Sequence, residues 1–566
     1  MIKHNSPISS VASYGNYIAT AGYDNKVILW EKKTKQFINR GCHDHLANYV
    51  TFSPSGNYLL STSSDYTARL WSLPEMKLTA VLSNHDDDVE SASFSNCGNY
   101  IATASRDHQV RIFNIKGELI KVFSGHTADV LSVVWSSDDT ELVSSGDDGT
   151  IRIWNVRDGS ENALFNFNGV ETDTCDMYNA FVYAGNDLGE INMIDTKRGK
   201  LSGVTKAHGA GIKSIKINQH LHLLVSSSYD RTVKLWRIES GTGVLDLYKE
   251  IFSPPSIWLR AVNIIDEKLM AFGTFGSCYA LYSLETEEWN FTNVEDTDGK
   301  NAVLAVGKDI YAVGDAGDIF FNDKIVAKTK SLCNFLLSVD GMIVTGGQTG
   351  ELFDAKTGNV IYQHYSPINC GTTYMSNGKK FAIIGTYTGE GIVFISENGG
   401  LKYETTVKLH SNAVKGLASN GNVIFSVCAN TDAAFHDAST LNLIKYIKHA
   451  HDLIANGTDW VANDTFVSVS RDKKLRIWDL NDRCEIIVSP HTHSIKCVKV
   501  SAIDNFLIAT GSYSGVIAIY NSKINEWIYT KKVSTSGISS ISFSIEENCF
   551  LFSSYDGNVN KINCLL

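Results

Sequence analysis

Apolar and polar side chains alternate in short segments along almost the whole chain, and turn residues separate the segments. The pattern is clearest in residues 125–155. There an alternating segment is followed by polar residues 136–140, a second apolar segment, the turn Asp147–Gly149 and a third segment that ends at Trp154. Period-two alternation over four to eight residues predicts half-buried β-strands, and an Asp-Gly turn predicts a tight connection between them. We therefore predict a chain of short antiparallel strands with almost no helix.

This strand unit recurs through the chain. A turn position is followed about six residues later by a large, mostly aromatic side chain, and fourteen such units occur at a mean spacing of about 41 residues. The regular pairs are Asp24/Trp30, Asp65/Trp71, Asp107/Phe113, Asp148/Trp154, Asp187/Met193, Asp230/Trp236, Gly276/Tyr282, Thr388/Phe394, Asn430/His436, Asp472/Trp478, Ser514/Tyr520 and Asp556/Ile562, with compressed units around Asp315–Phe321 and Gln348–Phe353.

The unit resembles the WD40 repeat, a four-stranded blade of a β-propeller. In that family a loop histidine, a second-strand Ser or Thr, the turn Asp and the third-strand Trp form a buried hydrogen-bonded tetrad, which gives partners to buried donors and acceptors. The resemblance covers the whole chain but is weaker in its second half. It assigns tetrad roles to His43, Asp65 and Trp71, to His126, Asp148 and Trp154, to His208, Asp230 and Trp236, and to His451, Asp472 and Trp478.

Fourteen blades are too many for one propeller, because propellers usually have four to eight. We therefore predict an all-β fold of two seven-bladed WD40 β-propellers in tandem. The expected domains are an N-terminal propeller, residues 1–297, and a more degenerate WD40-like propeller, residues 298–566, which meet in the polar run 294–300.

The last blade is expected to differ from the others, because the chain ends after a third strand, Val559–Ile562. Either that blade has three strands, or residues 1–5 cross over to supply a fourth. We favour three strands, because His4 fits the loop-histidine position of the first blade.

Composition limits the partners and the location. The net charge of −11, from 50 Lys+Arg against 61 Asp+Glu, disfavours nucleic acid or an anionic membrane as the main partner. Eleven cysteines without a CxxC pair indicate reduced thiols, and so a cytoplasmic protein. No apolar signal segment and no run of 18 apolar residues occurs, so secretion and membrane spanning are not expected.

The sequence indicates no catalytic, cofactor-binding or metal-binding residues. It has no GxSxG, phosphate-loop or paired-carboxylate motif, so we expect no enzyme. Residues 42–45, 449–452 and 491–493 contain metal-ligand residue types, but one histidine of each group fits a tetrad position and too few ligands remain. Residues 354–358 resemble the repeat turn of quinoprotein propellers, yet they also form an ordinary hairpin turn, so no cofactor is expected.

Candidate partner-binding residues lie on one edge of the ring. The loop histidine and the turn Asp share a hydrogen-bonded chain, so both emerge on this edge, the top face. Trp258 and Arg260 lie in an irregular loop of the same edge, and large aromatics and Arg dominate binding hot spots. Alternatively, the aromatics only pack on the turns beneath them. The residues that precede the turn position are Tyr23, Ser64, Arg106, Asp147, Asn186, Tyr229 and Phe275, and the three aromatics lie on blades 1, 6 and 7, which ring closure makes neighbours.

Two weaker signals accompany the aromatic residues. Asp86, Asp87 and Asp88 form an acidic run on the same face, which either captures a basic segment of a partner or is a solvated edge. The corresponding positions of the second propeller include Arg471, Tyr513 and Tyr555, which suggests a second recognition surface.

Three functions are compatible with this sequence. The leading hypothesis is a non-catalytic scaffold that binds one or more partner proteins on the top faces. The architecture is also similar to that of actin-interacting protein 1, a family of two seven-bladed rings that assists cofilin in filament disassembly, and this resemblance implies an actin-filament regulator. The third hypothesis is a propeller enzyme or small-molecule sensor with a site in a central channel. That site needs polar residues on the first strand of each blade, whereas this strand is apolar in blades 3, 4 and 6.

Overall fold

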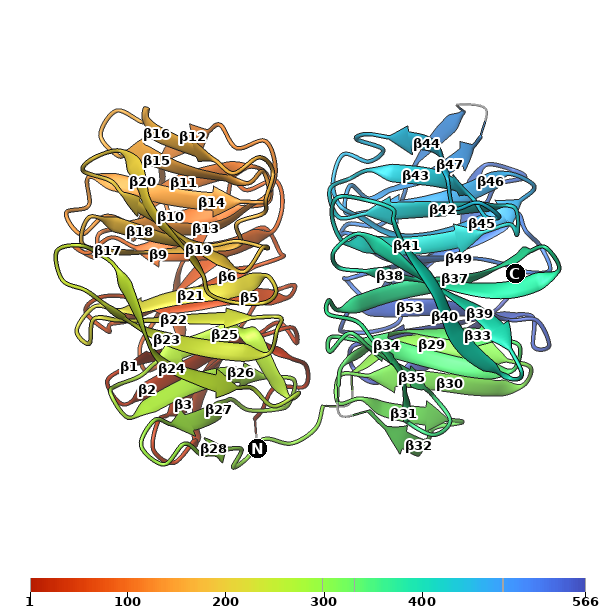
Figure 1. The fold of residues 1–566 in the computed structure, drawn as a ribbon, viewed down its shortest axis with the longest axis horizontal. Coiled ribbons are helices and arrows are strands. Elements are labelled where there is room, and N and C mark those ends of the chain that lie inside the picture. The colour runs from red at the N-terminus through yellow and green to blue at the C-terminus, as the bar shows by residue number, and fades with distance from the viewer. Residues whose placement is uncertain (1, 298, 330, 481–482, 565–566) are drawn as a thin grey trace. The chain divides into compact units, whose positions relative to one another are not determined.

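The computed structural model describes residues 2–297, 299–329, 331–480 and 483–564. These residues form fifty-five strands and no helix (Figure 1). They therefore contain no helix that is long and apolar enough to cross a membrane. Within the same residues, thirteen sheets have four strands and one has three. The predicted fold class, all-β with two seven-bladed propellers in tandem, is confirmed.

The chain divides into two compact units, Met1–Thr297 and Asp298–Leu566. In the first unit the strands, four to a blade, are β1 (Ile8–Tyr14), β2 (Tyr17–Gly22), β3 (Lys26–Glu31), β4 (Phe37–Cys42), β5 (Ala47–Phe52), β6 (Tyr58–Ser63), β7 (Ala68–Ser72), β8 (Lys77–Leu82), β9 (Val89–Phe94), β10 (Tyr100–Ser105), β11 (Gln109–Asn114), β12 (Leu119–Ser124), β13 (Val130–Trp135), β14 (Glu141–Gly146), β15 (Thr150–Asn155), β16 (Glu161–Asn166), β17 (Thr174–Tyr178), β18 (Phe181–Gly185), β19 (Glu190–Asp195), β20 (Lys200–Lys206), β21 (Ile212–Asn218), β22 (Leu223–Ser228), β23 (Thr232–Ile238), β24 (Leu245–Phe252), β25 (Ile257–Ile264), β26 (Leu269–Thr274), β27 (Ala280–Ser283) and β28 (Trp289–Asn290).

The second unit continues the blade numbering from 8 to 14. Its strands are β29 (Lys300–Val306), β30 (Asp309–Gly314), β31 (Asp318–Phe321), β32 (Lys324–Lys328), β33 (Cys333–Val339), β34 (Met342–Gly347), β35 (Glu351–Asp354), β36 (Val360–Gln363), β37 (Ile368–Ser376), β38 (Lys379–Thr386), β39 (Glu390–Glu397), β40 (Gly400–Lys408), β41 (Val414–Ser419), β42 (Val423–Cys428), β43 (Ala433–Asp437), β44 (Leu443–Ile447), β45 (Ala455–Ala462), β46 (Thr465–Ser470), β47 (Lys474–Asp479), β48 (Cys484–Val488), β49 (Ile495–Val500), β50 (Leu507–Ser512), β51 (Val516–Asn521), β52 (Glu526–Lys532), β53 (Ile538–Ser544), β54 (Cys549–Ser554) and β55 (Val559–Asn563).

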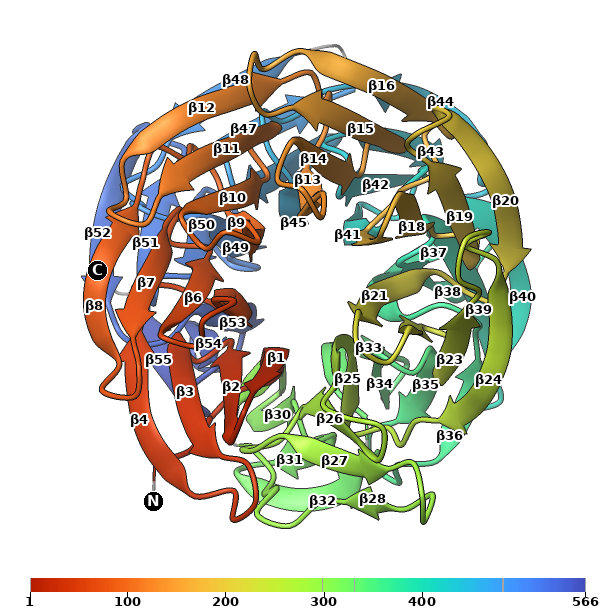
Figure 2. The same cartoon turned by 90° about the vertical axis from the view of Figure 1, so that its left-hand side faces the viewer.

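Each blade is an antiparallel meander whose first strand lies at the centre of the ring and whose fourth lies at the rim, as Figure 2 shows for the first unit. The second strands are buried on both faces because neighbouring blades cover them. In β14, for example, residues 142–146 are all buried and combine apolar with small side chains. The fourth strand β16 instead alternates exposed and half-buried residues. This gradient explains why alternation predicts the outer strands better than the inner ones.

The core of each unit consists of separate apolar clusters, one between each pair of neighbouring blades. One cluster joins Ile8 of blade 1 to Ala271 of blade 7 and closes the first ring. A smaller one joins Val303 of blade 8 to Cys549 and Leu551 of blade 14 and closes the second.

Blade 14 has three strands in the described part of the chain, in the order β53-β54-β55. The N-terminal segment belongs instead to the first ring, where the His4 backbone N–H donates to the carbonyl oxygen of Ser277 in blade 7 at 3.0 Å. The expectation of a three-stranded last blade agrees with this arrangement.

Candidate protein-interaction site

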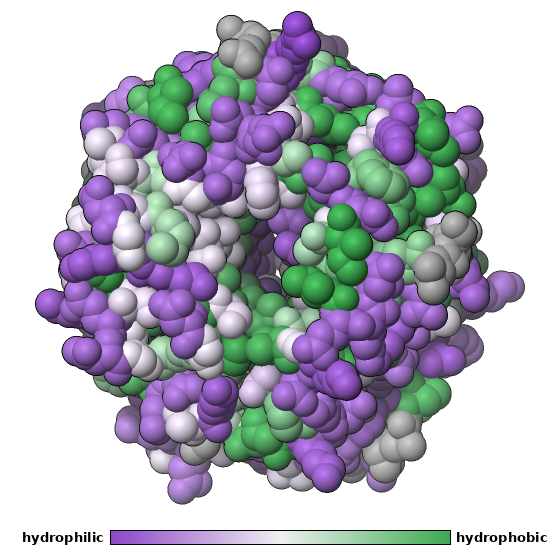
Figure 3. Space-filling model, turned by 90° about the vertical axis from the view of Figure 1, so that its right-hand side faces the viewer, coloured by the Kyte–Doolittle hydropathy of each residue, from purple (hydrophilic) through white to green (hydrophobic). Residues whose placement is uncertain are grey.

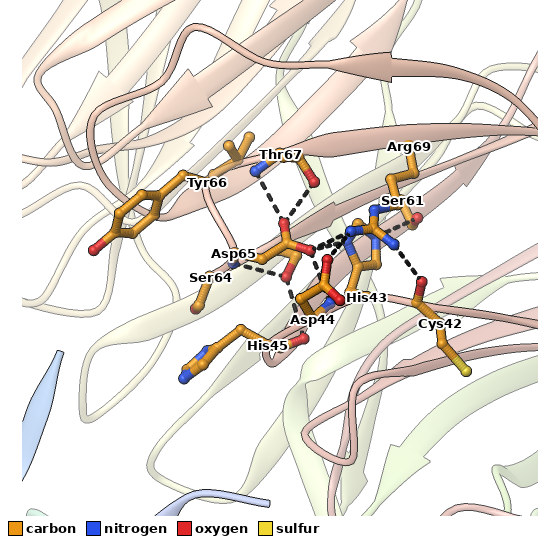
Figure 4. Close-up of polar contacts among 12 residues, drawn as sticks. Cys42, His43, Asp44, His45, Ser61, Ser64, Asp65, Tyr66, Thr67 and Arg69 are labelled. Atoms are coloured by element: carbon orange, nitrogen blue, oxygen red, sulfur yellow. Dashed lines mark hydrogen bonds and ion pairs between the residues drawn. The ribbon is translucent and has the colours of Figure 1, made fainter. Parts of the chain in front are cut away.

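Histidine-centred networks hold the top-face loops of the first ring in place. In blade 2, His43 Nδ1 donates to Asp65 Oδ2 at 2.9 Å, and its Nε2 accepts from Ser61 Oγ at 2.7 Å (Figure 4). The Trp71 indole N–H donates to the same Ser61 oxygen at 2.8 Å. Burial lowers the pKa of His43, which keeps the imidazole neutral, although Asp65 opposes this effect. Burial alone would raise the pKa of Asp65, but hydrogen bonds from His43 and Thr67 hold it well below its usual value.

The same geometry occurs in three more of the blades to which the sequence assigns a tetrad. The His Nδ1–Asp Oδ2, His Nε2–Ser Oγ and Trp Nε1–Ser Oγ distances are 3.0, 2.8 and 2.9 Å for His126, Asp148, Ser144 and Trp154, 3.2, 2.8 and 2.9 Å for His208, Asp230, Ser226 and Trp236, and 3.2, 2.7 and 2.7 Å for His451, Asp472, Ser468 and Trp478. The backbone N–H after the histidine also donates to the Asp, as Thr127 does to Asp148 at 3.0 Å. These contacts tie the loop before the first strand to the turn after the second.

Three of the aromatic residues singled out in the sequence meet where blade 7 joins blade 1. Tyr23 packs edge-on against Trp258 with ring centroids 5.4 Å apart, and Trp258 packs against Phe275 at 5.0 Å. Tyr23 and Trp258 are half-buried, but Phe275 is only 5% exposed. The prediction that Phe275 presents itself to a partner is therefore wrong, because Trp258 covers it. The Lys213 ammonium lies over the Tyr229 ring, 4.8 Å from its centre.

Charged side chains occupy the rest of the top face, around the central channel. Arg106 donates to Glu90 and Asp129. Burial alone would lower the pKa of Arg106, but the charges of these carboxylates outweigh the desolvation and raise it well above its usual value. Asp173 pairs with Lys213 at 2.7 Å and with Arg260 at 3.3 Å. The candidate residues Arg106 and Arg260 are thus held in ion pairs that cross between blades.

The acidic run of blade 3 is not the exposed patch that the sequence suggested. Asp86 is exposed, but Asp87 and Asp88 are 2% and 4% exposed. Asp88 Oδ2 lies 3.9 Å from Arg106 Nε, so part of its charge faces a cation inside the protein. These two residues shape the loop beside the channel and do not form a solvated edge.

A different acidic cluster lies between blades 4 and 5. Asp147, Glu171 and Asp173 place carboxylate oxygens within 4.8 Å of one another, close enough to hold a metal ion or a cationic side chain. Burial and the neighbouring carboxylates raise the pKa of both Asp147 and Glu171 well above the usual range. Asp173 differs: burial opposes its ionisation, but the Lys213 and Arg260 charges hold its pKa below the usual value. Neighbouring cations therefore compensate the negative charge of Asp173 but not that of Asp147 and Glu171.

Sequence reasoning missed Glu171, Asp173 and Lys213, as well as the role of Glu90. Glu90 and Lys213 are the extra residues of β-bulges in first strands, where the register against the second strand shifts by one. A bulge residue leaves the ladder and its side chain is re-aimed. A charged residue at the second position of an apolar first strand could have revealed both.

Two of the candidate residues of the second unit lie in contact. Tyr513 and Tyr555, on neighbouring blades 13 and 14, have nearly parallel rings with centroids 6.3 Å apart. Lys496 lies over the Tyr513 ring at 5.9 Å. Arg471 is half-buried, and its backbone N–H donates to the carbonyl oxygen of Ile454 at 3.0 Å.

Blade 11 of the second unit keeps more of the tetrad than the sequence analysis recognised. His410 Nε2 and Ser426 Oγ lie 2.8 Å apart, while His436 takes the place of the Trp. Burial lowers the pKa of His410 to about 3 and that of His436 to about 4. The shorter spacing of sixteen residues between His410 and Ser426 concealed the pair.

Comparison with known proteins supports the repeat class. Five segments match the family model "WD domain, G-beta repeat", and together with the fold they show that the chain contains WD40 repeats. All five lie in the first unit. The segments are residues 1–31, 35–72, 76–114, 117–155 and 199–237.

Similar proteins match only parts of the chain. The U3 small nucleolar RNA-associated protein 15 homolog of Xenopus tropicalis is 27% identical over 171 residues, which cover 30% of this chain and 31% of that protein. Nuclear distribution protein nudF of Aspergillus terreus is 37% identical over 79 residues, 14% of this chain and 17% of its own length. Mouse pre-mRNA-processing factor 19 is 34% identical over 76 residues, 13% and 15% of the two chains.

The chain thus spans about a third or less of the length of these curated relatives. Among solved structures, the crystal structure of the RRP9 WD40 repeats aligns with a TM-score of 0.44 and 17% identity, covering 48% of this chain and 88% of that one.

Proposed function

We propose that this protein is a non-catalytic protein-interaction scaffold whose main partner docks on the top face of its first ring, across blades 6, 7 and 1. The observation that carries the proposal is the half-buried pair Tyr23 and Trp258, packed together on a face whose loops the tetrads hold rigid. A rigid aromatic pair loses little conformational entropy on binding, and large aromatics dominate interface hot spots. The WD40 repeats support the interaction class in general.

The partner in this proposal is a protein that presents a basic segment. Asp147 and Glu171 supply carboxyl groups that crowd each other, and a Lys or Arg side chain of the partner would relieve that repulsion. Nucleic acid and membranes are not expected as main partners, because the chain carries a net charge of −11. The second unit, through Arg471, Tyr513 and Tyr555, offers a further surface. The cytoplasm is the proposed location, supported by cysteines buried inside strands, such as Cys175 and Cys333.

The experiment compares captured proteins. Wild type, Trp258→Ala and Tyr23→Ala are used as baits in a lysate of the native host, and Tyr100→Ala serves as the control because Tyr100 is an exposed aromatic at the opposite edge of blade 3. The affinity for the partner so identified is then measured. Truncating a hot-spot aromatic costs about 2 kcal/mol or more, about thirtyfold in affinity. If both variants melt normally and bind the partner with wild-type affinity, the partner does not dock on Tyr23 and Trp258.

Regulation of actin filaments is a second candidate, supported by the two-ring architecture alone. Sedimentation of actin filaments with cofilin, with and without this protein, tests it directly. Faster loss of filaments is the expected result, and no change in sedimentation would exclude this candidate.

A further inference from the structure

The central channel of the second unit differs from that of the first. In the first unit a hydrogen bond crosses the channel, from Lys216 Nζ in blade 6 to the Tyr49 hydroxyl in blade 2 at 2.6 Å. In the second unit the first strands of all seven blades enclose a cavity of ≈420 Å³. Figure 3 shows that the face of the second unit drawn there is hollowed at its centre. A volume of this size suits a small molecule.

A β-bulge that recurs in every blade of the second unit makes this cavity polar. Every first strand of the second unit contains a β-bulge next to its start, and the extra residue of each bulge lines the cavity. Because a bulge residue leaves the ladder, it can project into the channel while its neighbours keep the blades packed. The seven residues are Asn301, Asn334, Asn369, Lys415, Asn456, Lys496 and Ser539.

The asparagines are anchored and keep hydrogen-bonding capacity. Asn334, Asn369 and Asn456 each donate one amide N–H to a backbone carbonyl of the next blade, at 3.1, 2.9 and 2.7 Å. A carboxamide has a second N–H and a carbonyl oxygen. The bonds to the next blade therefore fix the side chains, while the remaining donors and acceptors line the cavity.

The charge of the cavity is positive although the chain as a whole is acidic. Its described lining contains Lys415, Lys496 and Lys499 but only one carboxylate, Asp459. Asp459 is bonded to Lys499 at 3.0 Å. Lys415 lies over the ring of Tyr387 at 4.7 Å, on the neighbouring blade.

Lys415 of blade 11 and Lys496 of blade 13 line this one cavity. The Lys496 ammonium lies over the Tyr513 ring at 5.9 Å, on its own blade. Burial raises the pKa of the Cys370 thiol of blade 10 to about 12, and the charges of both lysines act in the opposite direction. An anionic ligand in the channel would be attracted by both lysines.

We propose that the channel of the second unit binds a small phosphate-bearing molecule through Lys415 and Lys496, with the asparagine amides contacting its oxygen atoms. Phosphate fits because lysine binds it as a point charge, and because its several oxygens can reach lysines on blades that are not adjacent. The cavity size favours a free small molecule over a phosphorylated side chain of a protein. This site is independent of the top-face interaction of the first ring.

The test is calorimetric titration of the full-length protein with pyrophosphate, inorganic phosphate and citrate. We expect saturable binding of pyrophosphate that weakens at higher salt. Replacing both lysines, Lys415→Ala with Lys496→Ala, should reduce affinity at least about tenfold, because each removes a charge-assisted contact. The matched control, Lys531→Ala with Lys532→Ala, removes the same charge from exposed positions of the rim strand β52 and should bind as wild type.

Several outcomes would overturn the proposal. They are saturable binding that survives in the lysine double variant, the absence of any binding of pyrophosphate and inorganic phosphate at millimolar concentration, or equal affinity for citrate, which carries no phosphate. Tighter binding of a phosphoserine peptide through the same lysines would refute the choice of a free small molecule. If the double variant melts abnormally, Lys496→Gln alone should still weaken pyrophosphate binding, and wild-type affinity in it would also refute the site.

Discussion

Removing the turn aspartate of blade 4 is the most direct test of how the top face is built. The Asp148 side chain accepts four hydrogen bonds: from His126 Nδ1 at 3.0 Å, from Thr127 N at 3.0 Å, and from Thr150 N and Oγ1 at 2.9 and 2.6 Å. The substitution Asp148→Ala removes all four acceptors at once. It leaves the histidine side chain, which is 1% exposed, with only the Thr150 hydroxyl, 3.2 Å from Nδ1, in place of the carboxylate.

The expected cost follows from which donors water can reach. Thr127 is exposed, so water replaces the acceptor of its backbone N–H. The imidazole of His126 remains enclosed between Ser144 and Trp154. The Thr150 hydroxyl is a longer and uncharged replacement for the carboxylate, and it loses its own bond to Asp148. Removing one partner of a buried polar group costs about 1–3 kcal/mol, so we expect the unfolding free energy of the first unit to fall by about that amount. For a unit of this size the midpoint of melting should drop by roughly 2–5 °C.

Differential scanning calorimetry is the assay, because it separates the transitions of two units that melt independently. Asp158→Ala in the exposed turn of the same blade is the control. The Asp158 carboxylate accepts bonds from the backbone N–H and hydroxyl of Ser160 in the same turn, so the substitution should change stability by less than about 0.5 kcal/mol. Asp148→Asn keeps one acceptor oxygen and should lie between the two. A melting point of Asp148→Ala equal to that of wild type, or equal to a destabilised Asp158→Ala, would refute the reasoning.

Three further predictions concern the first unit. Burial alone would raise the pKa of Asp24, but its bonds to His4 and Lys26 lower it to about 2. Ionised Asp24 therefore adds about 2 kcal/mol to the unfolding free energy above pH 4, and this contribution is lost as the pH falls toward 2. Denaturant unfolding of wild type and Asp24→Asn at both pH values should differ only at the higher pH. Gly146→Ala should cost about 1–3 kcal/mol in the same assay, because its Cβ would lie 2.1 Å from the Asp129 carbonyl oxygen, and a neutral result would contradict the packing. Lys35→Met should lower the melting point, because the Lys35 ammonium donates to three carbonyl oxygens of blade 7 and the loop after it, whereas Lys33→Met at an exposed position should not.

The fold could be predicted from the sequence because one unit is repeated fourteen times. Each copy confirms the reading of the others, so degenerate blades around Asp315 and Gln348 were still recognised. The histidine spacing had the same benefit, since His126 and Asp148 are separated by the same distance along the chain as His43 and Asp65. Only where the spacing changes, as at His410, did the pattern fail.

The site was predicted less well because exposure depends on contacts between blades. The sequence placed Tyr23 and Phe275 in equivalent positions, but only the structure shows that both pack against Trp258 and that Phe275 is buried whereas Tyr23 is half-buried. The channel residues were missed for a different reason. A bulge adds one residue to a strand, so Lys213 and Lys415 interrupt the alternation of apolar and polar residues. A search for period-two alternation cannot distinguish such an interruption from a strand of poor pattern.

The way the first ring closes implies that its proposed partner would also stabilise the ring. Among the described strands, every blade is made of consecutive segments, so no strand from one end of the unit completes a blade at the other. Only side-chain and loop contacts therefore join blade 7 to blade 1, and Tyr23 and Trp258 lie on opposite sides of that junction. A bound partner that covers both residues would hold blades 7 and 1 together. At a concentration of 100 times its Kd it would add about 2.7 kcal/mol to the closed ring, and its departure would shorten the lifetime of the unit against proteases.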